Sequence, residues 1–393
     1  MRGLTQIARK TGLMLLACVF VTAGGIDVQP RIPPGYIPQP ESRDEQGLWM
    51  EMGEFEDSLK RSPLIMHDTA LNAYVSDLAC RIAGEYCSDI RVYLIRNPGF
   101  NAFMTPNGMM VIWSGLLMRV RNEDELATVI GHEIAHYLRL HSLRLWRKAR
   151  RDFAAGSVLS LGIGVATGVL LPVGESLALL SALAFSREQE EEADLLGIRL
   201  LADAGCDPHA SYRVWETLIA EEARAAAKRD EPGIFSKTHP DAETRALTLR
   251  NTVTELFGPA ADTTQSRQRY AAALAGQYQV LMEDQIDTNR YGRTEFLLEL
   301  HSAMGIDVGL VEFYRGEMYR QRAAEGDVEL ARSAYLLAIA TGDPHPEAYR
   351  NLGYIALKSG DRTTAAGYFR QYLAASPEAS DREMIEFYLE DIP

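Results

Sequence analysis

The sequence predicts an α+β protein that is mostly helical, with one small sheet in its N-terminal half. Branched residues over 90–95 predict a strand, and two apolar segments, 101–105 and 109–113, flank the turn dipeptide Asn107-Gly108. Most of the remaining chain has the apolar periodicity of helices. After residue 262, the spacing of small and aromatic residues predicts helical repeats. We therefore expect two domains, with the sheet in the first.

The first 23 residues predict a signal peptide. Arg2, Arg9 and Lys10 precede an apolar segment, and the small residues that end at Ala23 fit the rule for signal-peptidase cleavage. Processing as a lipoprotein at Cys18 is the weaker alternative, because the apolar segment before it is short. We expect an exported, periplasmic chain. Removal of these three positive charges would shift the formal charge from −14 to −17, which argues against a nucleic-acid partner.

Two interruptions divide the mature chain. Prolines between residues 30 and 40 predict an extended linker over 24–61. Glycine, proline and small polar residues over 258–262 break the helical pattern. The predicted domains are therefore 62–257 and 262–393.

The pentapeptide HEIAH, which begins at His132, is the strongest functional signal in the chain. Positions i and i+4 of a helix lie on one face, so His132 and His136 can bind one metal ion, with Glu133 beside them as a general base. Asn122, followed three residues later by Glu125, predicts the start of the required helix. The alternative is a chance match in an ordinary amphipathic helix.

A third metal ligand has to come from elsewhere in the chain. Arg139 and Ser142 stand where the pattern HExxHxxGxxH requires glycine and histidine, so that class of zinc protease is excluded. His141 is one residue out of register. We expect it at the surface or behind a ligand.

The acidic segment 186–194 contains the better candidate. Helical phase places Glu190 and Asp194 on a stripe of small and apolar residues, whereas Glu188 and Glu192 fall on a solvated face. Glu190 is therefore the predicted third ligand of one zinc ion per chain. Asp194 is predicted to accept a hydrogen bond from a ligating histidine. Three protein ligands leave the fourth position to water.

Three segments together resemble a known family. HEIAH, SREQEEEAD from Ser186 and SKTHP from Ser236 resemble the zinc metallopeptidases that include the CAAX prenyl endopeptidase and the HtpX heat-shock protease, and the periplasmic BepA-like group most of all. The resemblance implies a zincin-type metallopeptidase domain with Glu190 as third ligand. It also implies that His239 lies at the active site, as a displaceable fourth ligand or as a donor to the tetrahedral intermediate. A loop histidine is the alternative.

The same resemblance implies a role in substrate binding for Asn101, Ala102 and Phe103. A strand edge beside a metal can bind an extended peptide through backbone hydrogen bonds. The alternative is an ordinary hairpin strand.

Cysteine spacing predicts one local disulfide. Cys80 and Cys87 flank a predicted helix end, close enough to pair in an oxidising compartment. Two buried thiols are the alternative, and Cys206 is expected to stay free.

Residues 262–393 are predicted to form a domain of helical, TPR-like repeats that bind protein partners. One unit has the spacing of a 34-residue helix-turn-helix repeat, and a second, degenerate unit precedes it. The residues are Tyr349, Leu352, Gly353, Ala365, Phe369 and Pro377 in the first, and Gly316, Ala331, Tyr335 and Ala338 in the second.

Residues 153–185 are nearly all apolar, with interruptions at Pro172, Gly174 and Glu175. Several glycines in this segment suit close helix packing. We predict a helical hairpin that lies beside or over the cleft and can contact a membrane. A transmembrane hairpin is the alternative.

Together these observations predict an exported zinc-dependent endopeptidase. The resemblance implies that its substrates are unfolded or misassembled envelope proteins. The alternative is a TPR-based chaperone or assembly scaffold with a latent metal site. The intact Glu133 favours the enzyme, because a scaffold needs no general base.

Overall fold

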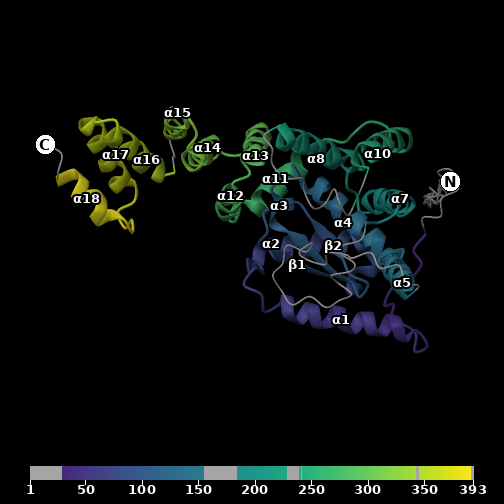
Figure 1. Ribbon diagram of the computed structural model, residues 1–393. Helices are drawn as coiled ribbons and strands as arrows, with labels where there is room; N and C mark the ends of the chain where they lie inside the picture. The colour runs from purple at the N-terminus through teal and green to yellow at the C-terminus, as the bar shows by residue number, and fades with distance from the viewer. Residues whose placement is uncertain (1–28, 155–183, 228–238, 240, 342–344, 391–393) are drawn as a thin grey trace, which may run out of the picture.

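The computed structural model describes residues 29–154, 184–227, 239, 241–341 and 345–390 (Figure 1). The predicted signal peptide over 1–23, with Cys18, lies outside these residues, as does most of the predicted hairpin over 153–185. Among the described helices, none is long and apolar enough to cross a membrane.

The three predicted strands are confirmed and form one sheet. They are β1 (Arg91–Ile95), β2 (Ala102–Met104) and β3 (Met109–Trp113), in the order β1-β3-β2. The central strand β3 runs parallel to β1 and antiparallel to β2, so β2 lies at an edge. The turn before β3 requires Gly108, which has a φ of 84° and whose Cβ would collide with the Asp89 carbonyl oxygen.

Helices cover both faces of the sheet. Side chains alternate along β3: Met109, Val111 and Trp113 face one apolar cluster, and Met110 and Ile112 face the other. The first cluster includes α1 (Arg43–Leu59) and α5 (His141–Ala154), and the second includes α2 (Thr69–Ala83) and α4 (Glu123–Leu138). Figure 1 shows α1 on the side of the sheet opposite α4. All five residues of β3 are buried because the strand is central.

The predicted linker over 24–61 is wrong for its second half. Leu48, Met52, Phe55 and Leu59 recur at helical spacing in α1, and all four are buried against the sheet. The prolines that suggested a linker all precede this helix. The peptidase half of the molecule therefore includes Arg43–Leu59.

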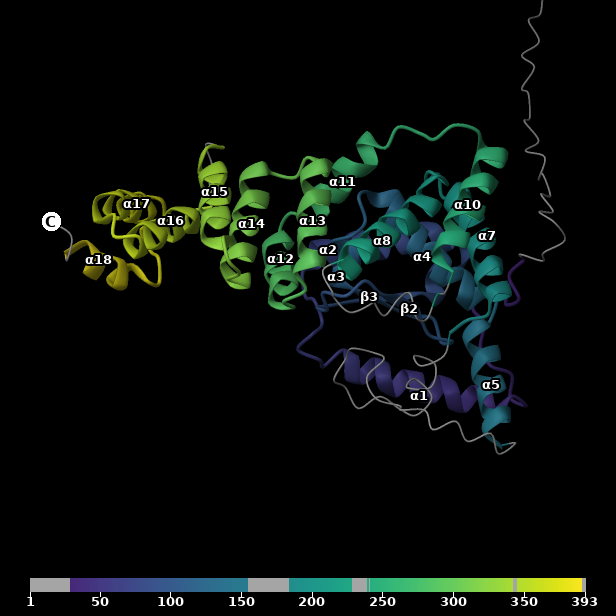
Figure 2. The same ribbon diagram turned by 45° about the horizontal axis from the view of Figure 1, so that its top comes forward.

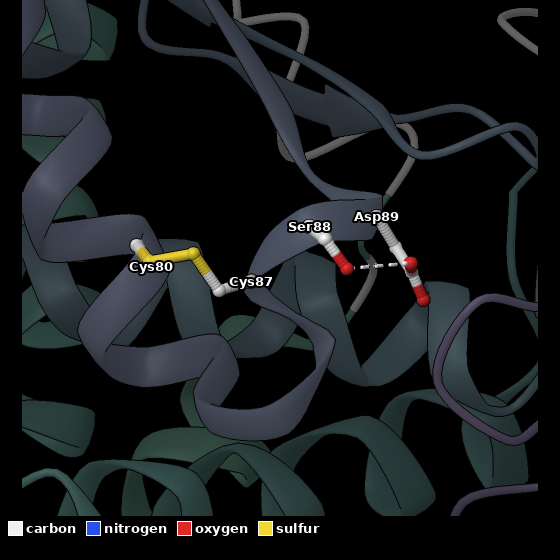
Figure 3. Close-up of a disulfide and its surroundings, with 4 residues drawn as sticks. All are labelled: Cys80, Cys87, Ser88 and Asp89. Atoms are coloured by element: carbon white, nitrogen blue, oxygen red, sulfur yellow. Dashed lines mark hydrogen bonds between the residues drawn. A yellow bond between two sulfur atoms is a disulfide. The ribbon is translucent and has the colours of Figure 1, made fainter.

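The predicted disulfide between Cys80 and Cys87 is present. It joins the last turn of α2 to the 3-10 helix η1 (Gly84–Asp89), which leads into β1 (Figure 3). Beyond the bridge, Asp89 accepts hydrogen bonds from the backbone N–H of Gly35. Closing this short loop stabilises the fold by roughly 2 to 3 kcal/mol. Cys206 is buried and free.

Three further helices lie on the same side of the sheet as α4 (Figure 1). They are α7 (Arg187–Asp203), α8 (Ala210–Ala227) and α10 (Ala242–Phe257). The short helix α3 (Ser114–Leu117) follows β3 and turns the chain toward α4. Helix α4 is buried along its whole length, because β2, α2, α7 and α8 all contact it.

The predicted boundary at 258–262 does not separate two bodies. Helices α11 (Thr264–Leu274), α12 (Tyr278–Asp287) and α13 (Tyr291–Met304) pack onto the peptidase half and share its apolar core. Tyr270 donates a hydrogen bond to the Leu117 carbonyl, and His301 Nε2 lies 2.8 Å from the Met118 carbonyl oxygen. The break over 258–262 is therefore a loop within one continuous core.

A buried ion-pair network reinforces this junction. Arg119 donates two hydrogen bonds of 2.7 Å to Glu221 of α8, and Arg293 of α13 donates a third of 3.2 Å. The side chains of Arg119 and Glu221 are 2% and 1% exposed. Burial raises the pKa of Glu221, but the charge and hydrogen bonds of Arg119 outweigh it and leave that pKa below its ordinary value. Glu221 is therefore ionised at neutral pH.

The remaining helices, α14 to α18, form an arm that leads away from the rest of the molecule, which we call the body (Figures 1 and 2). In two of its helix pairs a glycine faces an aromatic ring: a Cβ at Gly316 would overlap Tyr335, and one at Gly353 would overlap Phe369. The helical C-terminal region is confirmed, and its classification as TPR stays a prediction. The helices are α14 (Val308–Arg322), α15 (Asp327–Ile339), α16 (Glu347–Lys358), α17 (Arg362–Ala375) and α18 (Arg382–Glu390).

Candidate metal centre

Helix α4 begins where the sequence predicted and carries the HEIAH residues. Asn122 is its N-cap, and its side chain accepts a hydrogen bond of 2.9 Å from the Glu125 backbone N–H. Glu125 departs from the predicted capping box, because its carboxylate accepts from the Arg121 backbone N–H. His132 and His136 then lie one turn apart, and both are buried.

Helix α7 presents Glu190 to these histidines. Ser186 and Gln189 form a reciprocal capping box that fixes its start. Two glycines allow α4 and α7 to approach closely: a Cβ at Gly131 would lie 2.8 Å from Leu201 Cδ1, and one at Gly197 would lie 3.3 Å from the His132 backbone nitrogen. Glu190 is thereby brought beside the histidines.

Four buried residues offer converging ligand atoms. His132, His136, Glu190 and His239 each contribute one nitrogen or oxygen, and these atoms all lie within 4.8 Å of one another. Nε2 of His132 lies 3.0 Å from Nε2 of His136 and 3.4 Å from Glu190 Oε2. Nδ1 of His239 lies 3.0 Å from Glu190 Oε1. The structure therefore brings together all three predicted ligands and the predicted active-site histidine.

Glu133 lies beside this cluster with spare hydrogen-bonding capacity. Its Oε1 atom is buried and has no hydrogen-bond partner among the described residues, and it lies 3.7 Å from His239 Nε2. A buried, unpartnered carboxylate oxygen is costly unless the site has a use for it. Imidazole and carboxylate donors together suit a zinc ion, so the residues present fit the predicted metal.

Asp194 supports His132, as helical phase predicted. Its Oδ1 atom lies 3.1 Å from His132 Nδ1. The sequence analysis missed Arg245 of α10, which donates hydrogen bonds of 2.6 and 2.7 Å to Asp194 and also pairs with Glu190. The signal was present in the sequence, because Arg245 shares a helical stripe with the buried Leu249 and Val253.

Arg245 is also held by an aromatic ring. Its guanidinium carbon lies 3.8 Å from the centroid of the Trp215 ring. Burial opposes its charge, but Asp194 and Glu190 outweigh that cost and raise the pKa of Arg245. This arginine therefore stays charged and orients the carboxylates of Asp194 and Glu190.

His136 has a second histidine behind it. Nδ1 of His141 lies 2.8 Å from Nδ1 of His136, and Nε2 of His141 lies 2.9 Å from Glu192 Oε2. His141 is fully buried, so of its two predicted locations the structure selects the one behind a ligand. The solvated face predicted for Glu192 is wrong: its side chain is 18% exposed and pairs with Arg139 and Arg144.

Burial and charge set the protonation of the site. Burial and Arg245 oppose protonation of His132, but hydrogen bonds with Asp194 and Glu190 raise its pKa to about 9. Burial and the nearby His132 hold the pKa of His136 well below its ordinary value. Burial raises the pKa of Glu133, which makes it a stronger base than an exposed carboxylate.

The predicted substrate-binding residues lie at the sheet edge that contacts α4. Ala102 and Phe103 belong to β2, which pairs only with β3 among the described residues. The side chains of Asn101 and Ala102 are buried and that of Phe103 is half-buried. A substrate would therefore meet mainly the backbone of this strand. Their role in substrate binding stays a prediction.

Phe185 is a further neighbour of the site that the sequence analysis did not single out. Its ring stacks on His136, with centroids 4.0 Å apart and an angle of 25° between the planes. Phe185 immediately precedes Ser186, the N-cap of α7. It therefore covers one face of the His136 ring.

Comparisons with known proteins agree with this geometry. Residues 66–253 match the model described as Peptidase family M48. The beta-barrel assembly-enhancing protease of Escherichia coli (strain K12) is 27% identical over 295 residues, which are 71% of this chain and 55% of that protein. The mitochondrial metalloendopeptidase OMA1 of Schizosaccharomyces pombe is 34% identical over 213 residues, which are 52% of this chain and 58% of that protein.

The chain spans about half the length of the curated relatives that it matches. The matched region contains every residue of the candidate metal centre, from His132 to Arg245. It excludes α1 and all helices from α11 onward. Residues 66–253 are therefore a metallopeptidase domain of peptidase family M48.

Proposed function

We propose that this protein is an exported zinc-dependent endopeptidase that hydrolyses peptide bonds of unfolded or misassembled envelope proteins. The observation that carries the proposal is the buried cluster of His132, His136 and Glu190 beside the unpartnered oxygen of Glu133. The substrate class is supported by the printed name of the bacterial relatives, which are proteases that enhance beta-barrel assembly. The predicted signal peptide supports export.

His132, His136 and Glu190 would hold one zinc ion. Zinc bound there would supply a Lewis acid for the scissile carbonyl and lower the pKa of a water molecule. Glu133 accepts the proton that this water loses and delivers it to the departing amine. The raised pKa of Glu133 suits both tasks, because a group must hold the proton between the two transfers.

His239 has a place in this proposal as the fourth ligand. Its Nδ1 atom belongs to the same cluster, 3.4 Å from His132 Nε2. If His239 also bound the zinc ion, it would occupy the position of the water molecule and would have to move away before hydrolysis. Substrate would pair with the edge strand β2 as an extended peptide. The arm of helices would bind protein partners.

Metal analysis and proteolysis of casein by the purified protein test the proposal together. Wild-type protein should contain one zinc ion per chain and cleave casein. Glu133→Gln should keep the zinc and lose about 10²- to 10⁴-fold in rate, because this residue handles protons. Glu191→Gln, an exposed position on α7, is the matched control and should change neither property.

Two results would contradict the proposal. Zinc-loaded wild-type protein that cleaves no unfolded substrate, yet suppresses its aggregation, would favour a chaperone or scaffold. Unchanged turnover in Glu133→Gln would reject the assigned general base.

A further inference from the structure

Helix α7 directs three carboxylates toward the two HEIAH histidines. Glu190 lies in the ligand cluster, and Asp194 contacts His132 directly. Glu192 lies between them in sequence and reaches His136 only through His141. Nothing in the hydrolytic step proposed above uses Glu192 or His141. His141 is nevertheless buried and Glu192 is half-buried, and both lie close to the predicted ligand His136.

We infer that Glu192 and His141 are positioning residues that fix the tautomer and orientation of His136 for metal binding. The inference deepens the proposed function and rests on it, because it assumes that His136 is a zinc ligand. It adds a support for the second histidine equivalent to the one that Asp194 provides for the first.

The proton positions follow from these contacts together with the requirement that a zinc ligand at His136 Nε2 carries no proton there, which leaves the His136 proton on Nδ1. Glu192 Oε2 accepts from Arg139 at 2.9 Å and from Arg144 at 3.3 Å, so this carboxylate is an acceptor for His141 Nε2–H at 2.9 Å. A neutral imidazole with its proton on Nε2 has an acceptor at Nδ1. His141 Nδ1 therefore accepts from His136 Nδ1–H across 2.8 Å. His136 Nε2 is left with its lone pair directed at the ligand cluster.

The two histidine supports share one design with different lengths. Arg245 holds Asp194, and Asp194 lies 3.1 Å from His132 Nδ1. Arg139 holds Glu192, and His141 is inserted between that carboxylate and His136. In both supports a buried arginine keeps a carboxylate of α7 in place. Each ligand histidine thus has its Nδ1 atom engaged and its Nε2 atom within the cluster.

Substitution of His141 separates positioning from packing. His141→Asn places an amide oxygen near the position of Nδ1 and can still accept from His136 Nδ1–H. His141→Phe fills the space with a ring that accepts no hydrogen bond. Zinc affinity, measured by competition with a chelator, should fall about 10- to 100-fold in His141→Phe and recover in part in His141→Asn. A packing role predicts the reverse order, because phenylalanine preserves the ring.

A second measurement does not depend on whether the variants fold. In zinc-loaded wild-type protein labelled with ¹⁵N-histidine, long-range ¹H–¹⁵N spectra should show a proton on Nδ1 of His136 and on Nε2 of His141. The opposite tautomer on either ring would overturn the inference. Equal zinc affinity in wild-type, His141→Phe and His141→Asn proteins would also overturn it.

Failure of this inference can be distinguished from failure of the proposed function. Wild-type protein that binds no zinc, or that keeps its zinc in Glu190→Ala, contradicts the proposed function. Wild-type protein that binds zinc and cleaves casein, with His141 variants that bind zinc equally well, contradicts only the positioning role. Glu191→Gln again serves as the matched control, because it lies on the same helix and is exposed.

Discussion

Two helix pairs in this protein are held close by glycine, and different groups fill the space between their helices. Gly131 and Gly197 let α4 and α7 approach, and ionisable groups of the metal centre lie between them. In α16 and α17, Gly353 faces the ring of Phe369, and the contact is apolar. Burying a charged group costs free energy, whereas burying an aromatic ring stabilises the fold. Close approach therefore serves chemistry in the first pair and packing in the second.

This difference predicts how each pair responds to substitution. Changes between α4 and α7 should affect zinc binding and catalysis more than stability. Changes between α16 and α17 should affect stability and leave the metal centre intact. The prediction requires that α11 to α13 belong to the body and that the arm begins at α14.

The largest effect is expected from removal of these connecting helices. A chain that ends after Asp262 loses Arg293, which pairs with the buried Glu221, and loses the cover of Tyr270 over Leu117. Glu221 keeps its two hydrogen bonds from Arg119, so the larger cost is the apolar core that α11 to α13 no longer cover, at about 25 cal/mol per Å². We expect no cooperative thermal unfolding and no bound zinc.

A chain that ends after Gly305 provides the comparison. It keeps α11 to α13 and every contact just described, so it should fold and hold zinc. Circular dichroism melts and metal analysis of both truncated chains measure the difference. Folding of the shorter chain around zinc would restore the boundary at 258–262.

The next largest effect is expected for Gly197→Ala. A Cβ at this position would lie 3.3 to 3.5 Å from backbone atoms of Gly131 and His132, which cannot move aside as a flexible side chain can. Helix α7 has to shift by a few tenths of an ångström and displace Glu190. We expect casein cleavage to fall by about 10-fold, because catalysis is sensitive to sub-ångström misplacement. Stability measured by urea unfolding should change little. A loss of stability with full activity would reverse the comparison.

Gly353→Ala should show the opposite pattern. Its Cβ would overlap the ring of Phe369, and overpacking of this kind costs about 1 to 3 kcal/mol. Zinc content and casein cleavage should be unchanged. Gly367→Ala is the matched control on α17, because no atom lies within 4 Å of its added Cβ and alanine favours the helix. Urea unfolding of both variants checks the prediction. If the two variants are equally stable, overlap with the Phe369 ring does not destabilise Gly353→Ala.

The smallest effect concerns the pH dependence of the ion pairs that Glu123 of α4 forms with Arg81 of α2 and Arg269 of α11. Burial raises the pKa of Glu123, but hydrogen bonds from Arg269, Arg81 and Tyr74 outweigh it and lower that pKa to about 2. A lowered carboxyl pKa contributes stability that is complete above the ordinary value of 4.5 and is lost as pH falls toward 2. Both arginines are 44% exposed, so we expect only about 1 to 2 kcal/mol.

Comparison of wild-type protein with Glu123→Gln measures this contribution. The difference in free energy of unfolding should be largest at pH 7 and should fall by about half at pH 3. The exposed pair of Glu329 and Arg332 supplies a control, because Glu329→Gln should leave stability unchanged at both pH values. A difference that grows as pH falls would contradict the assigned direction of the pKa shift.

Much of the metal centre could be predicted because its information is local. His132 and His136 lie within one helix, and the position of Glu190 follows from the phase of another. The stripe that contains Glu190 and Gly197 is buried as expected, whereas Glu188 and Glu191 are exposed. The same period explains why Asp194 reaches His132. A fixed rotation per residue is a property of the chain and needs no tertiary contact.

By itself the sequence determined the three strands, the start of α4, the local disulfide and the residues that converge as candidate ligands. Only the tertiary structure decided that Arg43–Leu59 covers the sheet, that Arg245 joins the two acidic residues and that His141 links Glu192 to His136. It also decided that the apolar core of the peptidase half continues past residue 262 through α13 and as far as Leu352 of α16. The physical reason is that contacts within an element follow from its period. Ion pairs and hydrogen bonds between elements depend on distances that packing sets.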